Sequence, residues 1–401
     1  MKLSKGLFLA FAGLGLFACS NEDVTENGAP IDGDAMVTVK INLPRVLEQG
    51  RSGDGVGATN ETSQTTGQTT PLTVNSITVT LHAAAGDKLV QSYIASGGSN
   101  DFTFSNSNGQ TGTITFTGVR NPQSIEVSVN GGTATPLTLA EINTAGLAAP
   151  LHQIVLTSDT DSSDGNGFTW DSGSKKYTAV VTPEPRYARL EISEISHATH
   201  AGGESCIFKT ATIAGVFLDN LKTTEEGAVS VNVAANKSIW DAINTDTYAS
   251  PTWSSINSDF LASSAKWPDD GKCYAYSLFG DLLPKLVFVI DGRGLAFTNN
   301  TVPMPDYTSG DDIYATVSKY KMDVSGLSDW TTNKAAYMSK YGVDEYGYFT
   351  SFKDGCIYKI SDIAIPDKAW GTTPAGGSNV TVEAIVKVLA WNVVEGTVEW
   401  N

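Results

Sequence analysis

A strict alternation of apolar and polar residues near the start of the chain restricts its fold more than any other feature. After Met36 every second residue up to position 43 is apolar, and the residues between are polar. Successive side chains of an extended chain point to opposite faces, so this pattern predicts a half-buried β-strand. The apolar residues of this first strand are Val37, Val39, Ile41 and Leu43.

Short alternating runs recur along the chain with turn residues between them. Their spacing is typical of an antiparallel β-sandwich. Helical stretches are few and short, at about 137–148, 238–244 and 332–341, and none opens a βαβ unit, which disfavours an α/β fold. The recurring runs include Ile77, Val79 and Leu81; Ile114 and Phe116; Ile125, Val127 and Val129; Ile154 and Leu156; and the ranges 286–290, 358–365 and 380–388.

Two prolines mark the expected domain boundary. Pro183 and Pro185 interrupt strand pairing because proline cannot donate to a β-ladder, and a new alternating pattern begins at Ala188. A chain of 401 residues with 41% hydrophobic residues is long enough to bury two cores. We therefore expect two all-β domains, over residues 52–183 and 184–390.

The first residues predict export as a lipoprotein. After a basic start, the apolar run over residues 7–17 is too short to span a membrane in the mature protein. Cys19 follows a small residue at the end of this run, as the lipid-bearing cysteine does after a signal peptide over 1–18. The residues 20–23 resemble the serine-and-acid tag of surface lipoproteins of the Bacteroidetes. An ordinary secretory signal with a chance cysteine is the alternative.

Charge and cysteine content exclude some partners and cofactors. The chain has 43 acidic and 26 basic residues, a formal net charge of −17, so it repels nucleic-acid phosphates. Apart from Cys19 it contains only Cys206, Cys273 and Cys356, so at most one internal disulfide can form, and its pairing stays open. The absence of a C-x-x-C spacing disfavours a zinc or redox motif.

Other residue groups gave no metal or catalytic site. His197 and His200 lack the glutamate of an H-E-x-x-H helix, and the acidic loop beginning at Asp159 has Trp170 where a calcium loop needs a carboxylate. Motifs for nucleophilic catalysis or phosphate binding are missing from the sequence. We therefore expect neither enzymatic activity nor a cofactor or metal.

A low-complexity segment follows the first strand. Residues 50–70 consist almost entirely of Gly, Ser, Thr, Gln and Asn, with Arg51 among them. Such a stretch can extend into the active site of an arginine-specific protease. Cleavage between Arg51 and Ser52 would remove a propeptide of residues 19–51, and with it the first strand.

A second arginine offers an alternative cleavage site. The bond between Arg45 and Val46 lies directly after the strand, whereas proteolysis favours a locally unfolded segment. Either cut would remove the strand. A sandwich that loses a strand exposes an apolar groove and unpaired backbone groups, which a β-strand from another molecule can occupy.

The end of the chain supplies a candidate for that incoming strand. The last alternating run continues past Ala390 into a tail over 391–401, with no evident turn to fold it back. Burial of four or five apolar side chains at about 1.5 to 3 kcal/mol each offers roughly 6 to 15 kcal/mol before ordering costs. Head-to-tail contacts of this kind generate filaments. The tail residues expected in the strand are Trp391, Val393, Val394, Gly396, Val398 and Trp400.

In these features the chain resembles the fimbrillins of the Bacteroidetes, the major-subunit family of the type V pilus. The resemblance implies two tandem transthyretin-like β-sandwich domains with few short helices. It also implies an outer-membrane lipoprotein precursor, cleavage after an arginine, and polymerisation by strand exchange into an extracellular fimbrium. The second arginine and the three further cysteines depart from the pattern. The motifs that carry the resemblance are Cys19, Arg51-Ser52-Gly53-Asp54-Gly55, Ala188-Arg189-Leu190 and Val386-Lys387-Val388-Leu389-Ala390-Trp391.

The resulting hypothesis is a structural fimbrial subunit. Its expected partners are copies of itself, other fimbrial subunits, an arginine-specific surface protease and host or bacterial surface ligands. A fimbrial anchor or tip adhesin is the alternative within the family. A surface lipoprotein that binds glycans is the alternative from another class.

Overall fold

The computed structural model describes residues 35–43, 45–46, 74–83, 88–94, 103–104, 111–145, 148–160, 166–192, 194–198, 206–231, 252–262, 274–299, 304–324, 330–360, 363–373 and 382–392. Within them the chain is mostly β, as the alternating pattern predicts, with the two helices α1 (Leu139–Ala145) and α3 (Trp330–Tyr341). Both lie where the sequence places a helix, and the range 238–244 falls outside the described residues. No helix in these ranges has the length and apolarity needed to cross a membrane.

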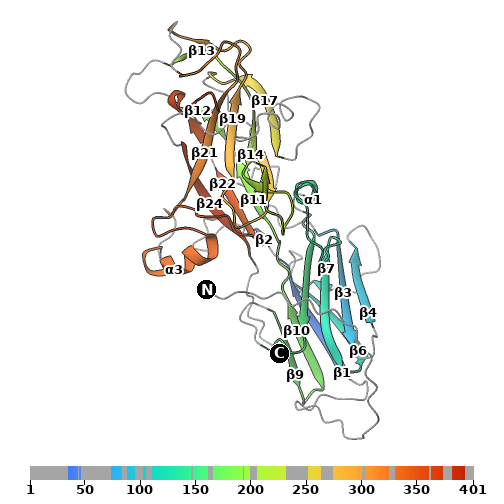
Figure 1. The fold of residues 1–401 in the computed structure, drawn as a ribbon. Helices are drawn as coiled ribbons and strands as arrows, with labels where there is room; N and C mark the ends of the chain where they lie inside the picture. The colour runs from blue at the N-terminus through green and yellow to red at the C-terminus, as the bar shows by residue number, and fades with distance from the viewer. Residues whose placement is uncertain are drawn as a thin grey trace.

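The first group of strands forms two sheets, in the lower part of Figure 1. Its strands are β1 (Ala35–Asn42), β3 (Ser76–Ala83), β4 (Lys88–Ile94), β5 (Thr103–Phe104), β6 (Thr111–Val119), β7 (Pro122–Val129), β8 (Leu151–Leu156), β9 (Gly167–Asp171) and β10 (Lys176–Val181). One sheet has the order β5-β6-β1-β10-β9 and the other β4-β3-β7-β8. The sheets contact each other through β7 and β8 on one side and β9 and β10 on the other, and their alternating apolar residues form a core between them.

The second group, in the upper part of Figure 1, is built on a nine-stranded sheet with the order β17-β14-β19-β21-β24-β22-β11-β18, which β2 joins beside β24. Its strands are β2 (Arg45–Val46), β11 (Ala188–Ile192), β14 (Thr212–Asp219), β17 (Trp253–Asp259), β18 (Tyr274–Leu278), β19 (Lys285–Ile290), β21 (Ile313–Met322), β22 (Cys356–Ile360) and β24 (Val382–Asn392). Three short pairs complete it: β12 (Ile195–His197) with β23 (Ile363–Ile365), β13 (Phe208–Thr210) with β20 (Ala296–Phe297), and β15 (Leu221–Lys222) with β16 (Val229–Val231).

The five-stranded and nine-stranded sheets are mixed, which corrects the expectation of purely antiparallel pairing, whereas the four-stranded sheet is antiparallel throughout. β1 runs parallel to β10, β11 to β22, β12 to β23 and β21 to β24. Parallel neighbours need a long connection, and the partners in each of these pairs lie far apart in the sequence. Such pairings leave no signal in local periodicity. The single strand expected over 358–365 is also divided between β22 and β23, which have different partners.

The prediction that Ile154 and Leu156 form the buried face of β8 is wrong. Ile154 and Leu156 are 44% and 48% exposed, whereas Val155 between them is buried opposite Ile125 of β7. Three consecutive apolar residues fit either face of a strand, so the alternation is ambiguous here. The register with β7 decides which residue points inward.

Hydrogen bonds to an ion pair of the second group, Arg186 with Glu225, join the two groups of strands. Arg186, just before β11, donates from Nη2 to the carbonyl oxygens of Thr133 and Thr135 at 3.0 and 3.2 Å. Its Nη1 lies 3.3 Å from Oε2 of Glu225, and the same oxygen accepts the backbone N–H of Leu137 at 3.1 Å. These contacts hold the loop between β7 and α1 against strands that come much later in the sequence.

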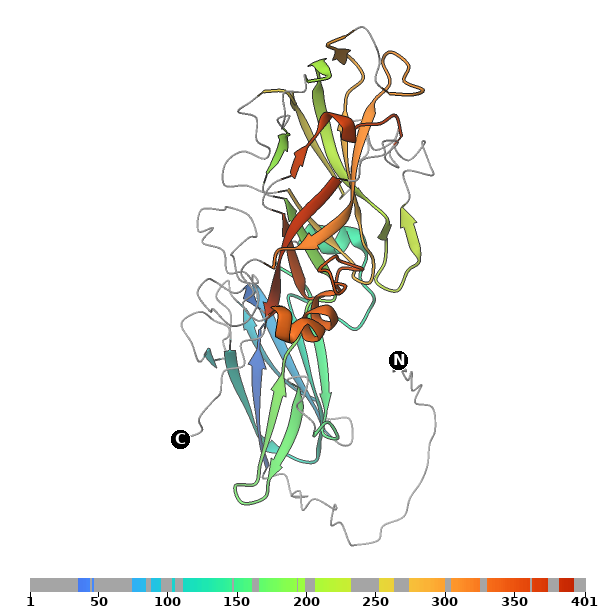
Figure 2. The same cartoon turned by 90° about the vertical axis from the view of Figure 1, so that its left-hand side faces the viewer.

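Helix α1 continues this attachment. Asn143 donates from Nδ2 to the carbonyl oxygen of Ser277 in β18 at 2.8 Å, and its Oδ1 accepts the backbone N–H of Ser277 at 2.9 Å. Residues that precede Pro183 in the sequence therefore contact the second group of strands directly. Figures 1 and 2 both show α1 between the two groups.

Three polar side chains cross the outer face of the four-stranded sheet. Glu126 of β7 accepts hydrogen bonds from Nε2 of His82 in β3 at 3.0 Å and from Nε2 of His152 in β8 at 2.9 Å. The hydrogen bond from His152, followed by that from His82, lowers the pKa of Glu126 although partial burial opposes it. The carboxylate thus ties three neighbouring strands together.

We predict a pH-dependent stability from this carboxylate. A carboxyl group whose pKa falls on folding adds stability above its unfolded pKa of about 4.3, and this stability is lost as the pH falls through the folded pKa. Glu126→Gln should therefore lower the free energy of unfolding at neutral pH by about 1 kcal/mol or less, because the site is partly exposed. Below about pH 4 the difference from the wild type should disappear. Urea unfolding at several pH values measures this, with His82→Leu as a variant that removes only one donor. An equal difference at all pH values would contradict the assignment.

Candidate strand-exchange site

Strand β1 occupies the middle of its sheet. It pairs antiparallel with β6 on one side and parallel with β10 on the other, and residues 37–41 have partners on both sides. Backbone donors and acceptors along both edges of β1 are thus engaged by neighbours. If β1 were removed, β6 and β10 would each present an unpaired edge on either side of a gap one strand wide.

The apolar face of β1 points into the core. Val37, Val39 and Ile41 are 0% exposed and Leu43, directly after the strand, is 4% exposed. Full burial of such side chains contributes about 1.5 to 3 kcal/mol each, so these four supply on the order of 6 to 12 kcal/mol. The structure therefore places all four residues of the predicted first strand in one buried row.

The residues directly after β1 contact the end of the last strand. In β2, Arg45 pairs with Asn392 and Val46 pairs with Trp391, the final residues of β24. Figure 1 shows β2 beside β24, in the gap between the two groups of strands. The N-terminal segment therefore spans both groups, with β1 in the first and β2 in the second.

Strand β24, which contains most of the alternating run expected over 380–388, lies inside the large sheet. It runs parallel to β21 and antiparallel to β22. The strand also extends through Asn392, so Trp391 belongs to it rather than to a separate tail that begins at 391. The local sequence pattern does not show that β21 and β22 are the neighbours of β24, because only the three-dimensional arrangement brings these strands together.

Several predicted site residues lie outside the described residues, and their roles remain predictions. These are the lipidation residue Cys19, the cleavage residues Arg51 and Ser52, and the tail residues Val393, Val394, Gly396, Val398 and Trp400.

The cysteines within the described ranges are free thiols. Cys356 is buried in β22, and burial raises the pKa of its thiol to about 12. Burial also raises the pKa of Cys206, which lies just before β13. Cys273 falls outside the described residues. Both described thiols are therefore poor nucleophiles at neutral pH.

Comparison with known proteins gives a likeness of fold. The sequence matches no protein-family model and no curated protein. A fimbrillin from Porphyromonas gingivalis W83 is 11% identical with a TM-score of 0.44, and the match covers 92% of this chain and 100% of that chain. The chain is similar in structure to fimbrillins of the Bacteroidetes. A fimbrial assembly protein from Parabacteroides distasonis ATCC 8503 is 10% identical with a TM-score of 0.32, over 84% of this chain and 93% of that chain.

The burial of β1 leads to a stability prediction. Ile41→Ala should lower the free energy of unfolding by about 2 to 5 kcal/mol, because it removes buried methyl groups and leaves a cavity in the core between the two sheets. Met36→Ala on the same strand is the matched control, since Met36 is 41% exposed, and it should change stability by about 0.5 kcal/mol or less. Chemical denaturation of the uncleaved chain measures both. Equal effects of the two substitutions would show that β1 does not hold the core together.

Proposed function

We propose that this protein is a structural subunit of a bacterial surface fimbrium, built from two tandem β-sandwich domains and polymerised by strand exchange. The observation that carries the proposal is the position of β1, a buried central strand at the N-terminal end of the described chain. A single cut after β1 would leave this strand without a covalent link to the rest of the chain. An edge strand would leave one open edge, whereas this strand leaves two.

The geometry of the gap suits a strand from another subunit. An incoming strand could form one ladder with β6 and another with β10, and it could bury a row of alternate side chains where Val37, Val39 and Ile41 now lie. The residues 393–401, which follow β24, carry the required alternation in sequence. Because donor and acceptor lie on different parts of each subunit, the contact is head-to-tail and leads to a filament.

The pairing of β2 supports Arg51–Ser52 as the cleavage site. Arg45 and Val46 are part of a β-ladder, and a protease must take up its substrate as a free extended strand. Cleavage after Arg51 would also detach β1 and β2 together. Trp391 and Asn392 would then lose their β2 partners at the base of the tail.

The proposed subunit is exported to the cell surface as a lipoprotein. The precursor would reach the outer membrane through lipidation of Cys19 and would move into the extracellular fimbrium after cleavage. Its partners would be further copies of itself, other fimbrial subunits, the arginine-specific protease and surface ligands. An anchor subunit would keep its lipidated N-terminal segment, and a tip adhesin would assemble without its own tail.

The first test is proteolysis of the precursor with an arginine-specific protease. We expect a product that begins at Ser52 and a ladder of oligomers on unheated gels. Arg51→Ala should abolish both, and Arg45→Ala, the matched control, should leave both unchanged. Mass spectrometry of the product reads out the cleavage site. A product that begins at Val46 would move the site to Arg45, and complete cleavage without oligomers would refute strand exchange.

The second test separates the two faces of the tail. Val398→Asp should prevent filament formation, because it would place a charge in an apolar groove. Thr397→Asp adds the same charge at the neighbouring position, which points to the opposite face of an extended strand, and should assemble normally. Electron microscopy of the cleaved protein measures the outcome. Normal filaments from Val398→Asp would rule out the tail as the donor strand.

A further inference from the structure

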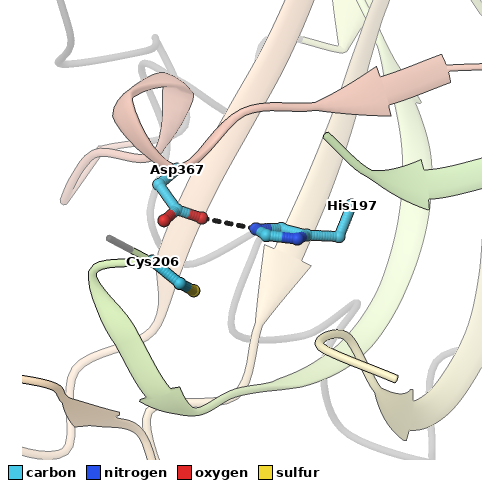
Figure 3. Close-up of side chains that lie close together, drawn as sticks. All are labelled: His197, Cys206 and Asp367. Atoms are coloured by element: carbon cyan, nitrogen blue, oxygen red, sulfur yellow. Dashed lines mark hydrogen bonds and ion pairs between the residues drawn. The ribbon is translucent and has the colours of Figure 1, made fainter. Parts of the chain in front are cut away.

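Three side chains with metal-binding atoms meet beside the short β12–β23 pair, at the upper end of the second group of strands (Figure 3). They are His197 at the end of β12, Cys206 just before β13, and Asp367 at the start of the 3-10 helix η3 (Asp367–Ala369). One ligand atom from each lies within 4.8 Å of the other two. Figure 3 shows the imidazole, thiol and carboxylate converging from three separate segments.

Backbone contacts fix this convergence. The parallel pairing of β12 with β23 sets His197 opposite Ile365, and the chain reaches Asp367 two residues later. One carboxylate oxygen of Asp367 lies 2.6 Å from Nε2 of His197. The other accepts the backbone N–H of Ile207 at 2.7 Å, which holds the adjoining Cys206 next to the carboxylate. The carboxylate is thus already oriented by the fold.

The surroundings of the cluster are largely apolar. Asp367 is 2% exposed, and the His197 side chain is 14% exposed. The ring of Phe260 packs edge-on against the imidazole at 5.0 Å, and Trp370 packs against Phe260 at 5.2 Å. Electrostatic attraction to a cation is stronger in such a setting than in water.

Hydrogen bonds hold His197 and Asp367 in place, whereas those of the Cys206 thiol are weaker. The contacts of Asp367 with His197 and Ile207 would form without a cysteine nearby. The thiol of Cys206 donates a weak bond to the carbonyl oxygen of Phe208 at 3.3 Å, and it also interacts with the neighbouring carboxylate of Asp367. Its position next to an imidazole and a carboxylate completes a set of one sulfur, one nitrogen and one oxygen ligand.

We propose that His197, Cys206 and Asp367 bind a divalent transition-metal ion, with Zn²⁺ as the best match. Zinc takes imidazole nitrogen, thiolate sulfur and carboxylate oxygen at roughly 2.0 to 2.3 Å in tetrahedral geometry, which puts ligand atoms roughly 3 to 4 Å apart. To reach this spacing the His197–Asp367 contact of 2.6 Å must open, and all three ligand atoms already lie within 4.8 Å of one another. On binding, the S–H bond of Cys206 breaks, a sulfur–metal bond forms and the proton passes to water, and the proton that Nε2 of His197 donates to Asp367 leaves that nitrogen for Nδ1 or for water.

The bound ion would join three segments that are distant in sequence. Three protein ligands leave the fourth tetrahedral position for water or for a side chain brought by another molecule. Since the ion binds only where the three segments meet, it would stabilise the folded form of this end of the protein. The site does not depend on strand exchange, so it stands or falls separately from the proposed function.

Cobalt(II) is the probe for the test, because its complex with a thiolate has a charge-transfer absorption band. The full-length chain without an added histidine tag would be freed of metal, reduced and titrated with Co²⁺, and Zn²⁺ would then be added. We expect one Co²⁺ per chain with a thiolate band that Zn²⁺ abolishes by displacement. Zn²⁺ alone should raise the unfolding temperature.

The variants identify the ligands. Cys206→Ser should lose the thiolate band, and His197→Gln should weaken binding by about tenfold or more. Cys356→Ser, which changes a thiol outside the cluster, should keep the band and the affinity. Unfolding temperatures without metal show whether each variant folds. A wild-type protein without the band would overturn the proposal, as would a band that survives Cys206→Ser and disappears in Cys356→Ser or Cys273→Ser.

Discussion

The double ladder around β1 is the interaction on which the first group of strands depends. Because β6 and β10 both pair with β1 and not with each other, the five-stranded sheet is continuous only while β1 is present. The same strand carries the buried row from Val37 to Ile41. One N-terminal segment thus supplies the backbone pairing at the centre of the sheet and part of the core below it. A chain built this way cannot lose the segment without replacing it.

The sequence predicts β1 correctly because the alternation of apolar and polar residues is a local pattern. Alternation over residues 37–43 depends only on which face meets the core, and the structure buries the predicted face. At β8 three consecutive apolar residues fit either face of the strand, and the register with β7 determines that Val155 points into the core. The position of β24 was beyond local reasoning, because a parallel neighbour and an antiparallel neighbour are brought to it from separate parts of the chain.

The candidate metal cluster shows the same limit more sharply. In the sequence, His197 has His200 as a nearby possible ligand, and this pair lacks the glutamate of an H-E-x-x-H motif. The structure instead places His197 beside Cys206 and Asp367 through the pairing of β12 with β23. Asp367 is 170 residues away in the sequence, and no spacing rule connects it to a histidine at that distance. Only the sheet topology makes these three side chains neighbours.

The two-residue strand β2 connects the groove to the tail in the proposed assembly. A strand this short makes few ladder bonds, so its position beside β24 depends on the anchoring of β1, to which it is joined within three residues. Loss of β1 would therefore release β2, and Trp391 and Asn392 would lose their partners at the same moment. Under the proposed function, one proteolytic event would open the acceptor groove and free the base of the donor strand. Under the same proposal, an uncut subunit would have neither and would stay monomeric until it is cleaved.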